Sequence, residues 1–296
     1  MIFIVILLTM HITSVNLGSF NSSKQLLDEY SNRRKIDIVC VSESFEFNDN
    51  IHMNGWECIS KARTPKVDTI NPHGGVAILA RVSVKIRKVK DITCPDIEVV
   101  CAETFIDNNK LLLVCVYILT DKDMDKLCKW ISQLDTVKYP NILICGDFNA
   151  HHTCWDQSYR FKTQKTCDKR GKLLFECITD NGYSIRNDRK PTCKQGDYII
   201  DLVLTKGLNS LNLNCSTDVH AVLSTIHHPV NTVIGQTKNK KVQKYNINKA
   251  SEEQMRSWKQ NLKRATEEWQ EKATSNSSTA NEMREQHFIR IGINVQ

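Results

Sequence analysis

Apolar residues gather in short runs along the first 235 positions, and Val and Ile dominate these runs. Each run is bounded by Gly, Pro, Asn or Asp, which is the pattern of buried β-strands. The glycine pair at 74–75 signals a turn just ahead of one run. The pattern predicts strands over residues 5–15, 35–43, 74–81, 82–89, 97–106, 110–119, 141–147 and 198–205.

Between the strands lie segments with helical periodicity, predicted as helices over residues 21–34, 121–134 and 168–182. The first can be capped by Ser22 or Ser23, and the last stops at Asn181-Gly182, a helix-ending pair. Strands outnumber the interspersed helices. The sequence therefore predicts an α/β domain of packed sheets with helices outside.

The pattern changes after Val233, so we expect the first domain to span residues 1–233. Residues 234–250 are polar, basic and without periodicity, which is typical of a linker. A capping box at Ser251–Gln254 then begins an amphipathic helix over 251–272. Its apolar stripe predicts that this helix docks onto the body of the protein or onto a partner. The alternative is that the helix binds nucleic acid. Residues 273–296 are predicted to be disordered.

The net charge of +7 is unevenly spread. The tail from Gln236 to Gln296 holds 12 Lys/Arg against 7 Asp/Glu, whereas Met1–Gly235 holds 28 against 26. The main body is therefore nearly neutral. If it binds a polyanion, it must do so through local patches rather than through bulk charge.

The twelve cysteines include no CxxC pair, and several lie inside apolar runs, among them Cys40, Cys115 and Cys145. Free cysteine behaves as a small buried hydrophobe, so we expect reduced thiols in an intracellular protein of the nucleus or cytoplasm. The apolar start is too short to span a bilayer. It is interpreted as a first buried strand, with a signal peptide and secretion as the alternative.

Polar residues stand at the ends of these apolar strands. Glu43 follows "IDIVCVSE", Asp147 and Asn149 follow "NILICG", and Asp201 lies inside "YIIDLVLT". Asn16 and Tyr117 close two further runs in the same way. A buried carboxylate is costly unless it is paired or bound to metal. The joint pattern predicts that the strand ends converge on one polar pocket.

The residue types in this pocket suit a hard cation such as Mg²⁺, which prefers oxygen ligands and substrate phosphate. His227 or His228 could contact a phosphate oxygen, which gives the parts of metal-assisted phosphodiester hydrolysis. Each residue alone has a simpler interpretation. Asp147 and Asn149 are good turn formers, Glu43 could lie on the surface, and Tyr117 could belong to the core. His151-His152-x-Cys154 could imitate half of a zinc site, but no second pair follows.

In this order, the segments "IDIVCVSES", "GGVAILAR", "GDFNAHHTCWD", "PTCKQGDYIIDLVLT" and "STIHHPV" resemble the endonuclease/exonuclease/phosphatase superfamily. More narrowly, they resemble the apurinic-type endonuclease domain of non-LTR retrotransposons, over about His11 to Val230. The resemblance implies a DNase I-like four-layer sandwich of two mixed β-sheets flanked by helices. It also implies a Mg²⁺-dependent endonuclease, with Mn²⁺ as an alternative ion, that nicks duplex DNA. No Tyr-x-Asp-Asp polymerase motif is present, so the chain resembles the endonuclease module without its reverse transcriptase.

The resemblance also assigns roles to single residues. Glu43 would bind the metal with Asn16 close by, and Asp147 would orient or deprotonate the attacking water. Asn149 and Tyr117 would hold the phosphate, and His227 would stabilise its developing charge. The remaining assignments are Asp201 as support for the rim, and Thr192 and His151 near the DNA.

One departure from the family pattern concerns the last strand. The family has Ser-Asp-His-x-Pro, whereas this chain has Thr225-Ile226-His227-His228-Pro229. We therefore expect His227 to lack its orienting carboxylate, which would weaken activity. Asp156, where the family usually has Gly, is a milder difference. The alternatives are a catalytically decayed nucleic-acid-binding remnant, or a secreted nuclease or phosphatase with disulfides.

Overall fold

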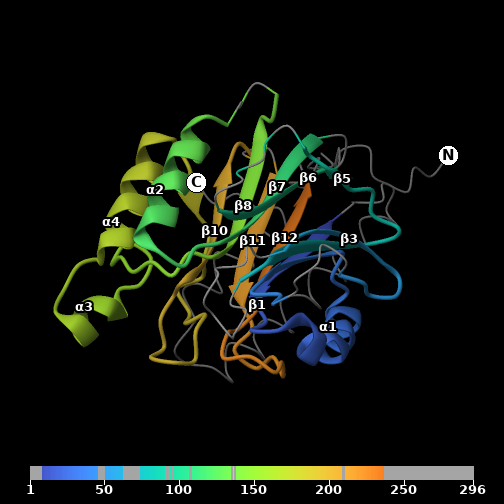
Figure 1. The fold of residues 1–296 in the computed structure, drawn as a ribbon, viewed down its shortest axis with the longest axis horizontal. Helices are drawn as coiled ribbons and strands as arrows, with labels where there is room; N and C mark the ends of the chain where they lie inside the picture. Colours follow the sequence, from blue (N-terminus) through green and yellow to red (C-terminus); the bar gives the residue numbers. More distant parts are fainter. Residues whose placement is uncertain are drawn as a thin grey trace, which may run out of the picture. The chain divides into compact units, whose positions relative to one another are not determined.

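The computed structural model describes residues 9–45, 51–62, 74–90, 92, 94, 97–106, 109–134, 136, 138–208 and 211–236. These residues form two six-stranded sheets (Figure 1). The first sheet has the order β11 (Leu211–Thr217), β12 (Val230–Gln236), β1 (Met10–Asn16), β2 (Ile38–Ser42), β4 (Val76–Arg81) and β3 (Trp56–Lys61). The second has the order β5 (Arg87–Lys88), β6 (Glu98–Ile106), β7 (Asn109–Tyr117), β8 (Asn141–Asp147), β10 (Asp201–Lys206) and β9 (Ser184–Ile185).

Both sheets are mixed, and their parallel pairs determine where the polar strand ends meet. β1 and β2 run parallel and bring Asn16 level with Ser42, the residue before Glu43. β7 and β8 run parallel and bring Tyr117 level with Asp147. The remaining neighbours are antiparallel, and among them β10 starts at Asp201 opposite Asp147. Several polar side chains therefore reach the same edge of the fold, as predicted for converging strand ends.

Four helices complete the described fold: α1 (Phe20–Arg34), α2 (Asp121–Ser132), α3 (Ser158–Thr163) and α4 (Lys169–Asp180). α2 begins with a capping box between Thr120 and Asp123. α4 begins after Asp168, whose side chain accepts the backbone N–H of Gly171 at 2.6 Å. Both caps satisfy N–H groups that a helix start leaves without partners. The cap of α1 was predicted wrongly, since it is Ser19 and not Ser22 or Ser23.

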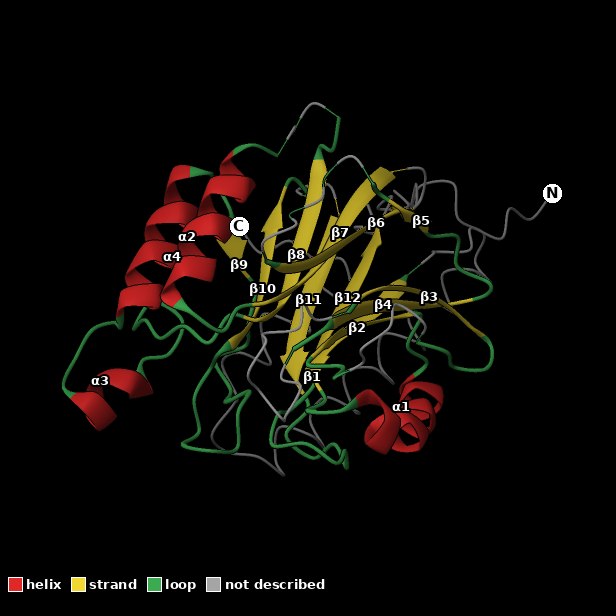
Figure 2. Cartoon of the chain, viewed as in Figure 1, coloured by secondary structure: helices red, strands yellow, loops and turns green. Residues whose placement is uncertain are grey.

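The elements stack as helix, sheet, sheet and helices (Figure 2). One apolar cluster packs α1 against the first sheet through Leu27 and Val39. A second fills the space between the sheets, with Ile78 and Leu113 among its members. A third packs α2 and α4 against the second sheet through residues such as Leu127. The prediction of two packed mixed sheets flanked by helices is confirmed.

Several element boundaries differ from those predicted. The run at 82–89 yields only the short β5, because Val82 and neighbouring residues form a turn and bend. The strands β3, β9, β11 and β12 and the helix α3 were not predicted. β1 begins at Met10, and residues 1–8 of the expected first strand lie outside the described residues. β12 continues to Gln236, whereas 237–250, the helix 251–272 and the tail 273–296 lie outside the described residues.

All twelve cysteines are free thiols, as predicted. Cys40, Cys115 and Cys145 are buried in the strands where the apolar runs placed them. Burial raises the pKa of the Cys101 thiol to about 12, which makes it a poor nucleophile at neutral pH. Among the described residues, no helix is long and apolar enough to span a membrane.

Candidate active site

Asp147 ends β8 as a buried carboxylate with a defined set of hydrogen-bond partners. Asn16 Nδ2 donates to Asp147 Oδ2 at 2.9 Å, and the backbone N–H of Asn149 donates to Asp147 Oδ1 at 2.9 Å. Burial and the charge of Asp201 raise the pKa of Asp147, whereas His227 and the two asparagine hydrogen bonds lower it, leaving it at about 7. A carboxylate whose pKa lies near neutral pH can accept a proton.

The residues around Asp147 explain why the strand ends in "GDFN". At Gly146 the backbone has φ 141°, and a Cβ would overlap the carbonyl oxygen of Val116 in β7. Only glycine therefore allows β7 and β8 to pair up to this point. Asn149 has φ 47°, and its Nδ2 donates to the carbonyl of Ile118 at 3.1 Å. These local constraints turn the chain sharply and leave the Asp147 carboxylate at the strand end.

His227 has an orienting carboxylate, so the expectation that Ile226 deprives it of one is wrong. His227 Nδ1 lies 2.8 Å from Asp201 Oδ2, and both side chains are buried. Ile226 is 50% exposed and does not provide this function. Asp218, the nearest aspartate in sequence, instead forms a 2.5 Å ion pair with Arg34. The orienting residue comes from β10, which is adjacent in space and not in sequence.

The ionisation of His227 is set by competing effects. Burial lowers its pKa, but the charge and hydrogen bond of Asp201, together with the charges of Asp147 and Glu43, raise it to about 9. The imidazole is therefore cationic at neutral pH. A buried imidazolium with Nδ1 held by a carboxylate can stabilise negative charge through its other nitrogen.

A pH titration of stability tests this pair. The folded pKa of His227 lies above its unfolded value of 6.5, so its contribution is complete below pH 6.5 and is lost as the pH rises through about 9. We expect His227→Gln to remove a pH-dependent stabilisation of roughly 3 kcal/mol from metal-free protein in EDTA. Urea denaturation at pH 6 and pH 9.5 measures it. The exposed variant His220→Gln is the control, and parallel pH profiles for wild type and His227→Gln would contradict the pair.

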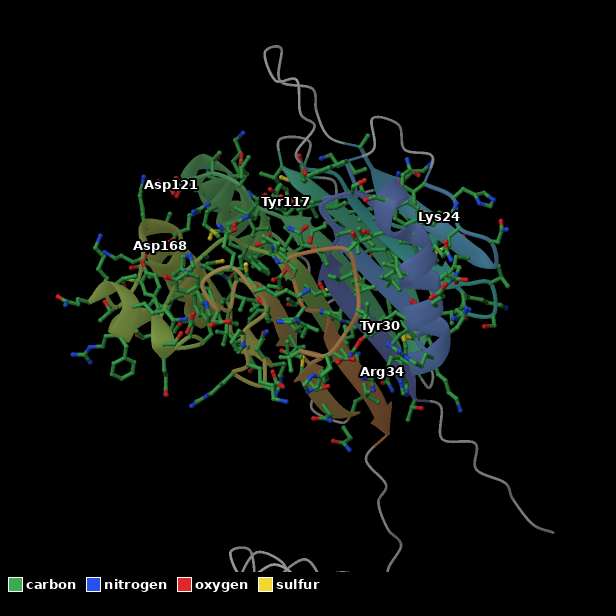
Figure 3. The ribbon with its side chains drawn as sticks, turned by 90° about the horizontal axis from the view of Figure 1, so that it is seen from below. Lys24, Tyr30, Arg34, Tyr117, Asp121 and Asp168 are labelled. Atoms are coloured by element: carbon green, nitrogen blue, oxygen red, sulfur yellow. The ribbon has the colours of Figure 1, made fainter. Side chains whose placement is uncertain are left out.

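Glu43 and Tyr117 meet at the same edge. The Tyr117 hydroxyl donates a short hydrogen bond to Glu43 Oε1. Burial, followed by the charges of Glu43 and Asp147, raises the pKa of Tyr117, so its hydroxyl stays protonated. In Figure 3 the Tyr117 label lies between the blue helix α1 and the green and yellow helices α2 and α4.

Thr192 lies beneath the site and not on its surface. It is fully buried, and its hydroxyl accepts the backbone N–H groups of Ile200 at 3.1 Å and Asp201 at 3.0 Å. Its carbonyl accepts the N–H of His228 at 2.7 Å. Thr192 therefore fixes the backbone on both sides of the Asp201–His227 pair. Its predicted place near DNA stays a prediction.

His151 lies apart from these contacts. Its ring stacks on Tyr159 at 4.8 Å and meets the edge of Tyr198 at 4.7 Å. Burial lowers its pKa. Through Tyr159 it connects the loop after β8 with α3, so its described contacts are those of a packing residue. Asp156, the other departure from the family pattern, is buried and accepts the N–H of Ser158 at 3.0 Å, which fixes the start of α3.

The site can be tested for its fit to a divalent cation. Asp201 Oδ1 is buried and has no hydrogen-bond partner among the described residues, which leaves an anionic oxygen to satisfy. Ligand atoms of Asp147, Asp201 and His227 lie within 4.8 Å of one another. However, His227 Nδ1 and Asp201 Oδ2 bond to each other. A hard cation prefers oxygen ligands, so the carboxylates at this edge suit it better than the imidazole of His227 does.

Sequence reasoning missed that Asp201 orients His227. A signal was available, because an aspartate inside a buried strand must have a partner, and a histidine is a common one. The sequence also gave no sign of Thr225, whose hydroxyl donates to the carbonyl of Asn16 at 2.7 Å and accepts the N–H of His227. This residue ties the β1 end of the site to its histidine.

Comparisons with known proteins show which family model and which folds the chain resembles. Residues 111–231 match a family model described as endonuclease-reverse transcriptase. Comparison with curated proteins gives no match. The endonuclease domain of TRAS1, a telomere-specific non-LTR retrotransposon, is 18% identical with a TM-score of 0.62, covering 77% of this chain and 98% of that one.

Two further structures share the fold. The AP endonuclease LMAP from Leishmania major is 13% identical with a TM-score of 0.64, covering 77% of this chain and 88% of that one. The 3′-5′ exonuclease NExo from Neisseria meningitidis is 16% identical with a TM-score of 0.58, covering 75% and 98%. The DNase I-like fold expected from the sequence is thus confirmed. Residues 111–231 thus resemble the endonuclease-reverse transcriptase family, and the described domain shares its fold with the TRAS1 endonuclease domain and the LMAP structure.

Proposed function

We propose that this protein is a divalent-metal-dependent endonuclease that nicks duplex DNA, in the manner of a retrotransposon endonuclease. The observation that carries the proposal is the convergence of Glu43 and Asp147 with the Asp201–His227 pair at one edge of the two sheets. The charges of all three carboxylates act on His227, so the groups share one electrostatic environment. This arrangement suits an acid–base attack on a phosphodiester.

The proposed reaction uses each group in a distinct way. Asp147 accepts a proton from water as the water oxygen attacks phosphorus, and its pKa of about 7 suits that role. The bond between phosphorus and the 3′ oxygen breaks, and that oxygen takes a proton from solvent. His227, held cationic by Asp201, stabilises the charge that develops on the phosphate.

Glu43 is the proposed metal ligand, with Asn16 close by. The Asn16 side chain donates a hydrogen bond to Asp147. A bound Mg²⁺ or Mn²⁺ supplies positive charge to the phosphate oxygens and lowers the pKa of water. The Tyr117 hydroxyl keeps the Glu43 carboxylate in place. Contacts of Tyr117, Asn149, Thr192 and His151 with DNA stay predictions.

Local charge supports duplex DNA as the partner. Residues 157–172 hold six Lys/Arg and one Asp, in a body that is otherwise nearly neutral. Within this segment Arg160 and Lys165 are exposed and have no ion-pair partner among the described residues. Lys162 Nζ donates to the carbonyls of Gly196 at 2.6 Å and Asp197 at 2.9 Å, which links α3 to the loop before β10. A local basic patch is what a phosphate backbone requires of a weakly charged protein.

A nicking assay on supercoiled plasmid tests the proposal. With Mg²⁺ or Mn²⁺ we expect conversion of supercoiled to open-circular DNA, and excess EDTA should abolish it. EDTA should leave the melting temperature within a few degrees, because the cores do not depend on the site. Restoration of nicking by added Mg²⁺ is the control for chelator damage. Nicking that persists at full rate in EDTA would contradict a metal-dependent mechanism.

A further inference from the structure

The backbone at Glu43 adopts a conformation that needs external support. Glu43 has φ 50° and Phe45 has φ 57°, both in the left-handed region that non-glycine residues rarely occupy. Such conformations persist only where surrounding structure enforces them. The carboxylate that we propose to hold the metal therefore depends on whatever fixes residues 43–45.

That support comes from two consecutive glycines. The N–H of Ser44 donates to the carbonyl of Gly75 at 3.1 Å, and the N–H of Phe45 donates to the carbonyl of Gly74 at 2.9 Å. Gly74 has φ 115° and Gly75 has φ 86°. A Cβ on Gly75 would overlap the Ser44 hydroxyl oxygen. The positive φ values and the crowding by side-chain oxygens both favour glycine at these two positions.

The glycine pair is anchored in turn by Glu98, which begins β6. Glu98 Oε2 accepts the N–H of Gly75 at 2.6 Å, and a Cβ on Gly74 would overlap the same carboxylate. A charged acceptor makes this a strong hydrogen bond. Glu98 therefore fixes the glycine pair, whose carbonyls accept the N–H groups of Ser44 and Phe45.

These contacts fix both the side chain and the backbone of Glu43. Glu98 is the cross-strand partner of Tyr117 in the β6–β7 register. The Tyr117 hydroxyl donates to the Glu43 carboxylate. Glu43 is thus held at its side chain by Tyr117 and, through Gly75 and Ser44, at its backbone by Glu98.

We propose that Glu98 is a positioning residue that sets the backbone and carboxylate of Glu43 for cation binding. This inference rests on the proposed function. Glu98 acts through the Gly75 N–H, so the position of its acceptor oxygen matters more than its charge. A direct ligand would have the opposite requirement, because the cation would bind the charge. Two conservative substitutions separate these roles.

Glu98→Gln keeps the length and an oxygen acceptor but loses the charge, whereas Glu98→Asp keeps the charge and withdraws the oxygen by one methylene. We expect Glu98→Asp to weaken Mn²⁺ binding about tenfold, in the range for residues that support metal ligands. Glu98→Gln should stay within about threefold of wild type. Isothermal titration calorimetry with Mn²⁺ alone measures both, at matched folded fractions checked by circular dichroism.

Glu103→Gln is the matched control. Glu103 lies on the same strand, is buried, and is bound by Arg87 and Lys110 rather than by the glycine loop. Its substitution should lower stability and leave Mn²⁺ affinity unchanged. The positioning role would be overturned if Glu98→Asp bound Mn²⁺ more tightly than Glu98→Gln. Equal Mn²⁺ affinities in both variants and wild type would also overturn it.

The two proposals fail in different ways. If wild type binds Mn²⁺ with the expected ranking of variants but does not nick DNA, the endonuclease proposal fails and the positioning of Glu43 stands. If wild type nicks DNA and both Glu98 variants bind Mn²⁺ as wild type does, the positioning role fails and the endonuclease proposal stands.

Discussion

Asp147→Asn should lower the rate of plasmid nicking by about 10²–10⁴-fold, the range for loss of a general base. The amide keeps the shape of the side chain but cannot take a proton from water. The free energy of unfolding should change by less than about 2 kcal/mol, because two effects oppose each other. Burial and Asp201 raise the pKa of Asp147 to about 7, so a neutral amide relieves the cost of the buried charge at pH 8. The amide also replaces one of the two acceptor oxygens with an NH2 group that faces the N–H of Asn16 or of Asn149. A large loss of activity with a small change in stability is the expected signature of a catalytic carboxylate.

The assay for Asp147→Asn compares initial nicking rates with Mg²⁺ at pH 8, alongside urea denaturation. Ile226→Asp is the companion variant. Because His227 is already held by Asp201 and Ile226 is half exposed, we expect this change to alter the rate by less than about threefold. Equal activity of wild type and Asp147→Asn would contradict the site. A large gain from Ile226→Asp would mean that His227 needs a second carboxylate.

Gly146→Ala should destabilise the fold by about 3 kcal/mol or more, although it adds a single methyl group. The backbone there has φ 141°, and the new Cβ would overlap the Val116 carbonyl oxygen in the neighbouring strand. Relief requires β7 and β8 to separate at the point where Tyr117 and Asp147 are paired. Strain at a special backbone position is one of the few causes of such large single-residue losses.

Urea denaturation followed by circular dichroism measures the loss, and Gly182→Ala is its control. Gly182 also has positive φ, at 67°, but nothing lies within 4 Å of a Cβ there. The control should therefore lose only the left-handed backbone penalty of about 1–2 kcal/mol. Equal losses in the two variants would show that the approach of β7 and β8 contributes nothing.

Much of the fold was predictable because most strands are buried on both faces and form apolar runs. β8 and β10 are of this kind, and their predicted bounds are close to those observed. β11 was missed because it alternates, "LNLNCST", with one face exposed. β3 was missed for a similar reason, since Glu57 interrupts a short edge strand. A search for apolar runs cannot detect a strand whose polar face is in solvent.

The candidate site was predictable as a set of strand ends but not as a set of contacts. Asp147, Glu43 and His227 were expected to converge, and the structure brings them into one environment. The expected lack of an orienting carboxylate for His227 was wrong, because the family pattern places that carboxylate at position 226, where this chain has Ile. The antiparallel pairing of β10 with β8 decides the matter by placing Asp201 opposite Asp147. Such pairings between distant segments follow from tertiary topology, which a local pattern does not encode.

The pairing of β1 with β12 has a consequence for how the protein is made. Thr13 in β1 bonds to Asn231 in β12, across 218 residues of chain. During synthesis β1 leaves the ribosome long before its antiparallel partner, which emerges only when the other described strands have been translated. Long-range pairings of this kind slow folding, and an exposed strand edge invites aggregation in the meantime. A nascent chain would therefore acquire Asn16 in its working position only in the last stage of domain assembly.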